Sequence, residues 1–180
     1  MHNIIAVVGM CGAGKSVACD YLENLDYQKI YFGGVTMDKL KEAGLDVTPE
    51  NEKMIREGLR KDLGMGAFAI VLLPKIKEAA LKGNVVLDGL YSWDELVILK
   101  KEFPNMITLA ITADKKLRYE RLSKRLVRPL SYEDAKKRDI AEIENSAKGG
   151  PISYADYYIL NNGTIKDFHG SLAKILNEIN

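Results

Sequence analysis

The sequence predicts an α/β fold in which a parallel sheet is covered by helices on both faces. Five short runs of β-branched or apolar residues recur along the chain, at 4–8, 29–32, 85–88, 106–111 and 157–160. Stretches with a helical spacing of apolar residues lie between these runs. Strands that are apolar throughout and alternate with helices are typical of a parallel sheet buried on both faces.

The helices follow from the apolar spacing between the strands. Helical periodicity predicts helices at 17–25, 68–81, 93–101, 115–126 and 164–179. The sequences SWDE, which begins at Ser92, and SYED, which begins at Ser131, are typical of the capping boxes at which helices start. A helix therefore follows nearly every predicted strand, as the crossover connections of a parallel sheet require.

Length and composition are those of one globular domain. The 180 residues are 47% hydrophobic and 28% charged, which is enough apolar material for a buried core. The formal net charge of +1 gives no overall reason to expect a nucleic-acid or membrane partner. No apolar run approaches the roughly 18 residues of a membrane span or follows a basic leader. Two cysteines, Cys11 and Cys19, form no disulfide framework, so we expect a reducing, cytoplasmic location.

Two segments do not fit the alternation of strands and helices. Residues 33–66 are polar and helix-prone, and residues 128–150 are highly charged and end in Lys-Gly-Gly. Long excursions from a compact sheet are often functional loops or lids. We therefore divide the single domain into a core (1–32, 67–127 and 151–180), an insertion (33–66) and a lid (128–150), and expect the insertion and the lid to move.

The most specific motif lies between the first strand and the first helix. Residues 9–16 read GMCGAGKS, which matches the phosphate-loop pattern G-x-x-x-x-G-K-[ST]. Glycines let successive backbone N–H groups point at phosphate oxygens, and the helix N-terminus adds a positive field. We expect Lys15 to reach the β- and γ-phosphates of a nucleoside triphosphate, whose base the loop does not specify, and the Ser16 hydroxyl to ligate Mg²⁺. The residues expected to hold the nucleotide are Gly9, Gly12, Ala13, Gly14, Lys15 and Ser16; the alternative is a glycine-rich turn without a ligand.

Asp88 ends the third predicted strand, beside the phosphate loop if the sheet is doubly wound. A carboxylate there can orient Mg²⁺ or accept a proton from an attacking hydroxyl. The alternative is an ordinary turn residue at the end of a strand. We interpret Cys11 as a plain loop residue and Cys19 as a buried small side chain. The two histidines, His2 and His169, are far apart in sequence and indicate no metal site.

Arginines recur regularly near the predicted lid. Arg118, Arg121, Arg125 and Arg128 are spaced three, four and three residues apart, which places them along one stripe of a helix. An arginine lid that closes over transferring phosphates accounts for this pattern, and a solvated charged helix is the alternative. Little aromatic interleaving and no nucleic-acid-binding fold accompany the arginines, which argues against nucleic acid as the partner.

These motifs together resemble the P-loop small-molecule kinases, the nucleoside-monophosphate-kinase-like group, over nearly the whole chain. The chain is most similar to dephospho-coenzyme A kinase and to the adenylate-kinase-related proteins of archaea. The lid of the former reads R-x-x-x-R and then L-S-x-E-x-A-x-x-R. This pattern is met by Arg121, Arg125, Leu130, Ser131, Glu133, Ala135 and Arg138. The ADYYILNNGT segment at 155–164 is similar to the ADYVI-N-G end of that family.

The resemblance implies a five-stranded parallel sheet, a lid, and an adenine site near Asn161, Asn162 and Gly163. It implies ATP and Mg²⁺ as the ligands of the phosphate loop. The candidates for the catalytic machinery are Lys15, Asp88, Arg121, Arg125 and Arg138, with Ser16 and Asp88 as the metal ligands.

Two departures from this family concern the acceptor side. Dephospho-coenzyme A kinases usually carry an aspartate just after the second strand, but residues 31–36 read YFGGVT, with no carboxylate before Asp38. They also carry a P-L-L-F-E type motif at the third strand, where this chain has Asp88 and Gly89, as adenylate-kinase-type enzymes do. The archaeal relatives share an LR…G segment, which here spans 59–64. The resemblance therefore carries over the donor site and leaves the acceptor open.

Two arginines of the insertion are candidates for binding the acceptor. Arg56 and Arg60 lie four residues apart, on one face of a helix, and could hold a phosphate of the acceptor bidentately. The alternative is a surface face of ion pairs shared with Glu52, Lys53 and Glu57.

The sequence thus predicts an ATP-dependent kinase that transfers the γ-phosphoryl group to a small, nucleotide-like acceptor, such as a nucleoside monophosphate. Three alternatives stay open. The first is a nucleotide-binding switch with slow ATP hydrolysis and a macromolecular partner, and the second is a nucleic-acid-processing ATPase. The third is dephospho-coenzyme A kinase itself. No membrane partner is expected, and the sequence specifies no oligomeric state.

Overall fold

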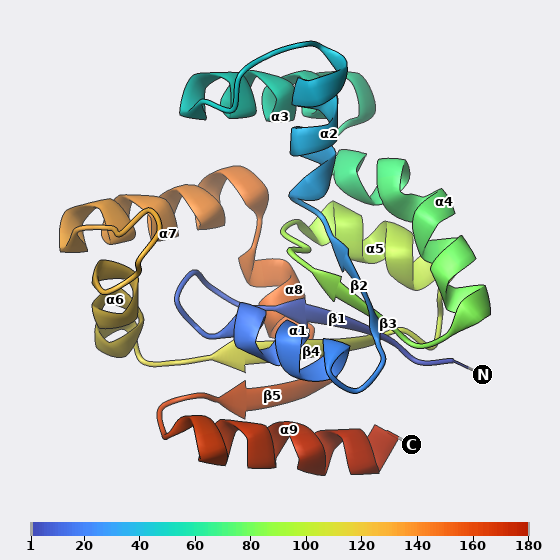
Figure 1. Cartoon of the computed structure of the whole chain (residues 1–180), viewed down its shortest axis with the longest axis vertical. Coiled ribbons are helices and arrows are strands. Elements are labelled where there is room, and N and C mark those ends of the chain that lie inside the picture. The colour runs from blue at the N-terminus through green and yellow to red at the C-terminus, as the bar shows by residue number, and fades with distance from the viewer. Residues whose placement is uncertain (1, 180) are drawn as a thin grey trace.

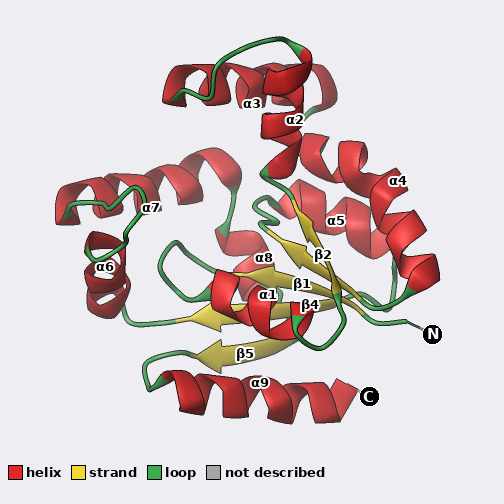
Figure 2. Cartoon of the chain, viewed as in Figure 1, coloured by secondary structure: helices red, strands yellow, loops and turns green. Residues whose placement is uncertain are grey.

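The computed structural model describes residues 2–179 and contains one five-stranded parallel sheet (Figures 1 and 2). The strand order across the sheet is β2-β3-β1-β4-β5, and all four pairings are parallel. The strands are β1 (Ile4–Val8), β2 (Gln28–Tyr31), β3 (Val85–Asp88), β4 (Ile107–Thr112) and β5 (Tyr157–Leu160). The predicted α/β fold with a five-stranded parallel sheet is therefore confirmed.

The helices cover both faces of this sheet (Figure 2). The helices of the described chain, those on the sheet and those beyond it, are α1 (Lys15–Glu23), α2 (Gly34–Glu42), α3 (Pro49–Leu63), α4 (Ala67–Lys82), α5 (Trp93–Glu102), α6 (Lys115–Ser123), α7 (Tyr132–Ser146), α8 (Gly149–Ser153) and α9 (Ile165–Ile179). α4, α5 and α8 pack on one face, and α1 and α9 pack on the other. Because the strands are parallel, the carboxyl ends of β1, β3 and β4 lie at one edge of the sheet. The helix after β1 and the helix after β3 leave this edge on opposite faces, which makes it the switch point of the fold.

The central strand β1 shows why the core has two halves. Ile4, Ala6 and Val8 belong to the apolar cluster under α4 and α5, whereas Ile5 and Val7 belong to the cluster under α1 and α9. Side chains alternate along a strand, so a strand between two helical layers must be apolar at every position. This explains why β1 reads as an unbroken apolar run.

The insertion and the lid stand outside the layered core. Residues 33–66 form α2 and α3 at the top of the molecule in Figure 1, and most of residues 128–150 form α7. The Thr48 side chain accepts a hydrogen bond from the backbone N–H of Asn51, so it caps the start of α3. The predicted capping box at Ser92 is present, and the Ser131 side chain caps α7 by accepting from the N–H of Asp134.

One prediction about the lid is wrong. α6 ends at Ser123 rather than at residue 126, so Arg125 and Arg128 do not share a helical stripe with Arg118. Pro129 accounts for the position of Arg128 outside any helix, because a proline disfavours helical backbone in the residue before it. Arg128 instead takes a left-handed conformation, with φ +52°. Within residues 2–179, no helix is long and apolar enough to cross a membrane.

Candidate nucleotide-binding and transfer site

The phosphate loop joins the end of β1 to the start of α1 and depends on its glycines. Gly9 and Gly14 have φ of +143° and +109°, which side-chain-bearing residues rarely adopt. A Cβ atom on Gly9 would collide with the carbonyl oxygen of Ile111, and one on Gly14 with the side-chain amide of Asn161. The loop therefore curls tightly against β4 and the end of β5 because these positions carry no side chain.

The start of α1 is free to bind an anion. In the part of the chain that the structure describes, no side chain caps its N-terminus, and the first N–H groups of any α-helix have no partner within the helix. The Lys15 ammonium donates to the carbonyl oxygen of Met10 at 3.1 Å, across the loop. Burial, aided by the nearby ammonium of Lys148, lowers the pKa of Lys15 to about 8. A half-buried cation beside N–H groups that have no partner within the helix is an arrangement that a polyphosphate would complete.

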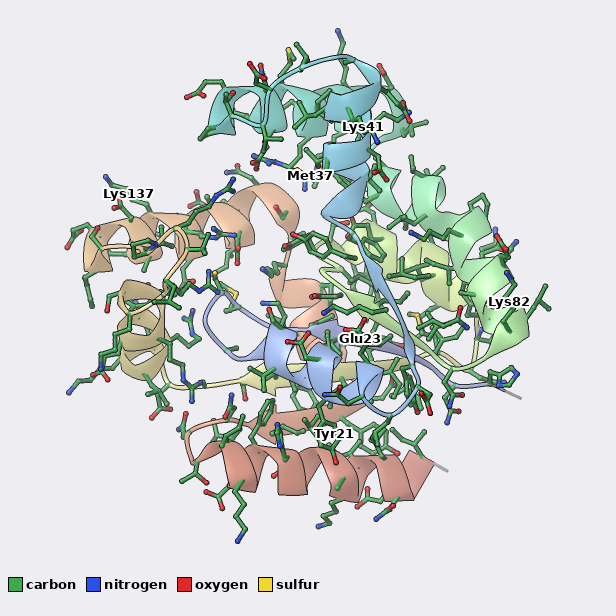
Figure 3. All side chains as sticks on the ribbon, viewed as in Figure 1. Tyr21, Glu23, Met37, Lys41, Lys82 and Lys137 are labelled. Carbon is green, nitrogen blue, oxygen red and sulfur yellow. The ribbon has the colours of Figure 1, made fainter. Side chains whose placement is uncertain are left out.

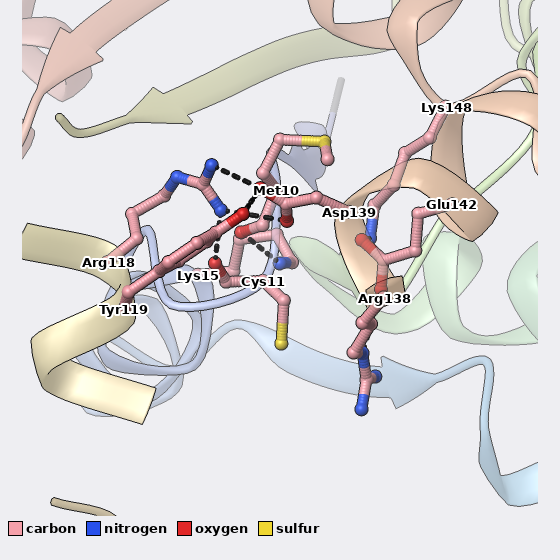
Figure 4. Close-up of polar contacts among 9 residues, drawn as sticks. All are labelled: Met10, Cys11, Lys15, Arg118, Tyr119, Arg138, Asp139, Glu142 and Lys148. Atoms are coloured by element: carbon pink, nitrogen blue, oxygen red, sulfur yellow. Dashed lines mark hydrogen bonds and ion pairs between the residues drawn. The ribbon is translucent and has the colours of Figure 1, made fainter. Parts of the chain in front are cut away.

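Two buried side chains fix the backbone of the loop. The Arg118 guanidinium donates to the carbonyl oxygen of Cys11 at 2.9 Å and to both carboxylate oxygens of Asp139, at 3.0 and 2.6 Å (Figure 4). The Asn161 side chain donates to the carbonyl oxygen of Ala13 at 2.8 Å. Arg118 and Asp139 lie on α6 and α7, so this buried ion pair links the lid helix to the phosphate loop.

The residues expected to surround adenine are only partly available to a ligand. The Asn161 side chain already supports the loop, and Asn162 accepts from the backbone N–H of Asp114 at 2.9 Å. Gly163 is exposed. Arg121 lies beside this segment: one of its terminal nitrogens donates to the carbonyl oxygen of Asn161 at 2.9 Å. The other terminal nitrogen of Arg121 is buried and has no hydrogen-bond partner among residues 2–179. Buried donors are normally satisfied, so this nitrogen is available to donate to a ligand.

Asp88 lies where the sequence predicts it, at the carboxyl end of β3 and in register with Val7 of β1. It is 9% exposed. Burial raises the pKa of its carboxyl group, while the ammonium groups of Lys29 and Lys15 oppose that shift. Ser16 is exposed in the first turn of α1. The structure thus places a hydroxyl in the first turn of α1 and a carboxylate at the end of β3, the strand that pairs with β1.

The described residues contain no cluster of three or more His, Cys, Asp or Glu side chains that could hold a metal alone. Of the histidines, His169 packs its ring against Tyr21, with 4.9 Å between ring centroids. Cys11 is buried with Tyr119 in a small apolar cluster under α6 and α7. Cys19 is fully buried, as predicted, and burial raises the pKa of its thiol.

A cavity of about 560 Å³ lies between the insertion and the lid. Figure 3 shows its surroundings, with Met37 on the insertion side. Four arginines line it: Arg56 and Arg60 from α3, Arg128 from the loop before α7, and Arg138 from α7. Three aromatic rings line it as well, those of Tyr31, Phe68 and Tyr91. The volume lies within the range of small-molecule sites.

The arginines of this cavity differ in how far they are neutralised. Glu52 accepts from Arg56 at 3.4 Å and from Arg128 at 3.0 Å, so it links α3 to the lid. Arg60 lies 5.9 Å from the centre of the Phe68 ring, and its buried Nε has no hydrogen-bond partner within the described chain. Arg56 is therefore neutralised in a surface ion pair, as the alternative interpretation of this helix face expects. Arg60, by contrast, has a donor nitrogen that is free to bind another group.

Sequence reasoning missed three residues next to this site. Asp139 and Glu142 on α7 bind Arg118 and Arg138, and Lys148 lies buried just after α7. Glu142 follows Arg138 by four residues, a spacing that signals a helical ion pair. Lys148 carries no such signal. Arg125, by contrast, was expected at the site, but it is exposed in the loop after α6 and does not line the cavity.

Comparison with known proteins places the chain in a family. Residues 5–146 match the AAA domain family. UPF0200 proteins of Thermococcus kodakarensis and Pyrococcus horikoshii are each 34% identical to this chain, over 98% of it and 97% of their own length. The chain therefore belongs to the AAA domain family and to the UPF0200 proteins.

Solved structures show the same fold at low sequence identity. Shikimate kinase from Acinetobacter baumannii in complex with shikimate superposes with a TM-score of 0.65 at 16% identity, over 99% of this chain and 94% of that one. Dephospho-CoA kinase from Campylobacter jejuni gives a TM-score of 0.57 at 17% identity, over 99% and 97%. The chain thus has a P-loop kinase-like fold, as the sequence resemblance implies.

Proposed function

We propose that this member of the AAA domain family is an ATP-dependent kinase that transfers the γ-phosphoryl group to a small, nucleotide-like acceptor. The observation that carries the proposal is the pairing of two anion-binding features. The uncapped N-terminus of α1, with Lys15, suits a polyphosphate, and the cavity with four arginines suits a second anionic molecule. Glu142 lines the cavity and lies near enough to Lys15 to influence its pKa, so the two features adjoin.

The roles of the donor side follow from its geometry. Lys15 and the N–H groups at the start of α1 would bind the β- and γ-phosphates and offset the charge that spreads over the transferring group. The buried, unpartnered nitrogen of Arg121 would donate to the nucleotide at the edge of the loop. Arg118 stays structural, because Asp139 and the carbonyl oxygen of Cys11 already use its donors.

Ser16 and Asp88 fit Mg²⁺ as an oxygen donor pair. Magnesium prefers hard oxygen ligands and keeps several waters, so it needs no dedicated cluster of protein ligands. When bound, the ion would supply Lewis-acid stabilisation of the phosphate charge. Asp88 could instead hold the proton of an attacking hydroxyl, since burial raises its pKa above that of an exposed carboxyl group.

On the acceptor side, Arg60 and Arg138 would grip an anionic group while Tyr31, Phe68 and Tyr91 offer apolar ring faces. Rings and guanidinium groups together suit a planar base that carries a phosphate. Closure of the insertion and the lid over the cavity would exclude water and limit wasteful ATP hydrolysis.

The test is ADP release from ATP and Mg²⁺ across a panel of acceptors, including nucleoside monophosphates, dephospho-coenzyme A and shikimate. The kinase proposal expects one acceptor class to stimulate release at least about ten-fold, and expects Lys15→Ala to abolish the stimulation. Turnover that is independent of every acceptor, or tight ATP binding without turnover, would overturn it. The second result would favour a nucleotide-dependent switch.

A further inference from the structure

Lys148 is a buried lysine at the joint between the lid helix and the core. It is 1% exposed and directly precedes α8. The residue before it, Ala147, ends α7 in a left-handed conformation, with φ +48°. This turn folds the chain back, so that the backbone N–H of Lys148 donates to the carbonyl oxygen of Glu142 at 3.3 Å. The same turn carries the Lys148 side chain over the end of α7.

The Lys148 ammonium is held by one carboxylate and one ring. It donates to Glu142 Oε2 at 2.6 Å, and it lies 4.5 Å from the centre of the Tyr91 ring. The other oxygen of Glu142 accepts from Arg138 Nε at 3.1 Å. Figure 4 shows the row of Lys148, Glu142 and Arg138, with Arg138 extending away from the other two. Glu142 therefore bridges two cations, one buried and one that lines the cavity.

The charges of this row do not cancel. Two cations and one carboxylate leave a net charge of +1, and the half-exposed end of the row is Arg138, whose side chain is 48% exposed. Burial alone would raise the pKa of Glu142, but the ammonium of Lys148 and the guanidinium of Arg138 outweigh it and lower that pKa. The carboxylate thus stays ionised, and its charge is shared between two partners.

We propose that Lys148 is a positioning residue that neutralises Glu142, so that the positive charge of Arg138 is left for an anionic group bound in the cavity. The inference rests on the proposed function, in which Arg138 faces the phosphate of an acceptor. Without Lys148, Glu142 has Arg138 as its one cationic partner in the row and competes with that anion. Without the charge of Glu142, neither cation is neutralised, and the row carries a charge of +2 beside the anion.

The proposal is tested by two substitutions with opposite expected signs. Lys148→Met takes the row from +1 to 0, Glu142→Gln takes it to +2, and the double variant returns it to +1. Lys137→Met is the matched control, because it removes an exposed positive charge from α7 (Figure 3) at a position that does not line the cavity. Thermal unfolding of each full-length variant confirms that it is folded before binding is measured.

The probe is inorganic phosphate, titrated into each protein while ADP and Mg²⁺ saturate the phosphate loop. The readout is the Arg138 Nε–Hε resonance in NMR spectra, assigned with Arg138→Lys. A charge change a few ångströms from an anion in a partly exposed site alters its binding by about three- to ten-fold. We therefore expect Lys148→Met to raise the Kd for phosphate by about that factor, and Glu142→Gln to lower it. The double variant and Lys137→Met should stay within about two-fold of wild type.

A merely structural role predicts a different pattern. If Lys148 and Glu142 only anchor the lid, both single variants weaken phosphate binding and the double variant does not restore it, which overturns the inference. An Arg138 resonance that phosphate leaves unmoved in the wild-type protein overturns it as well. Neither result decides whether the chain is a kinase, because acceptor-stimulated ADP release measures that separately.

Discussion

The phosphate loop and the arginine-lined cavity offer an anion different kinds of hydrogen-bond donor. The loop presents backbone N–H groups, and buried side chains hold its carbonyl oxygens from behind, as Arg118 holds that of Cys11. The cavity presents side chains instead, on two helical segments that Glu52 connects through a partly exposed contact with Arg128. The first arrangement is preorganised, whereas we expect the second to change shape if the insertion and the lid move.

This difference predicts where substitutions act. Substitutions in the loop, or in the buried side chains that support it, should cause a large loss of catalysis or stability, because no other part of the chain can replace its fixed backbone donors. Changes in the cavity should shift affinity in graded steps, because several arginines share the anion. Four experiments test this contrast between the loop and the cavity, in order from the largest expected effect to the smallest.

Lys15→Ala removes the cation of the loop. We expect acceptor-dependent kcat to fall by about a thousand-fold, since the charge that develops on the transferring phosphates loses its nearest counter-charge. The measurement is steady-state ADP release at saturating acceptor. Lys75→Ala, at an exposed position on α4, should leave the rate unchanged. A Lys15→Ala protein within ten-fold of wild type would contradict the role given to the loop.

Asp139→Asn breaks the buried ion pair behind the loop. Arg118 would keep its charge in a buried site and lose its ionic partner, which costs about 3 kcal/mol. We expect the free energy of unfolding, measured with urea, to fall by that amount. Asp38→Asn, an exposed change on α2, should alter it by less than about 0.5 kcal/mol. Equal effects of the two changes would show that the loop is not held in this way.

Arg60→Ala and Arg56→Ala compare a free with a neutralised arginine in the same cavity. Arg60 has a buried Nε without a partner in the described chain, whereas Arg56 pairs with Glu52. Loss of a charge-assisted hydrogen bond to substrate is worth roughly 1.5–3 kcal/mol, so Arg60→Ala should raise the acceptor KM about ten-fold or more. Arg56→Ala should raise it only a few-fold. The reverse order would mean that substrate binding redistributes these ion pairs.

Lys15 also predicts a pH dependence for the donor. Its pKa of about 8 in the free protein means that the ammonium loses its proton as pH rises through that value. The affinity for ATP should therefore fall between pH 7 and 9, by up to about ten-fold. Lys15→Arg should flatten the profile, because a guanidinium stays charged over this range. Calorimetric titration at several pH values measures both, and parallel profiles would assign the dependence to another group.

The sequence predicts the geometry of the phosphate loop far better than that of the arginine-lined cavity. The apolar run of β1, the glycines of the loop and Lys15 are local signals, and each lies where local rules place it. Arg118 illustrates the limit: its charge and spacing suggested a lid arginine, but it is buried against Asp139 and Cys11. The packing of α7 on α6 is what buries the Arg118 guanidinium, and no local sequence pattern predicts that packing.

The arginine-lined cavity depends on contacts between distant segments. Arg128 reaches Glu52 across 76 positions of the chain, and Lys148 meets Glu142 through a left-handed turn at Ala147. A helical stripe predicted from spacing failed because α6 ends early, which leaves Arg125 exposed. The spacing of Arg56 and Arg60 did predict one face of a helix, and both arginines line the cavity.

The central claim is that phosphate leaves the loop for a molecule in the arginine-lined cavity. It is tested most directly by ³¹P NMR of ATP and Mg²⁺ with the protein and each acceptor of the panel. We predict that the γ-phosphate signal is replaced by that of a new phosphoryl group on one acceptor class, and that Lys15→Ala prevents this. Release of inorganic phosphate alone, at the same rate with every acceptor, would contradict the account.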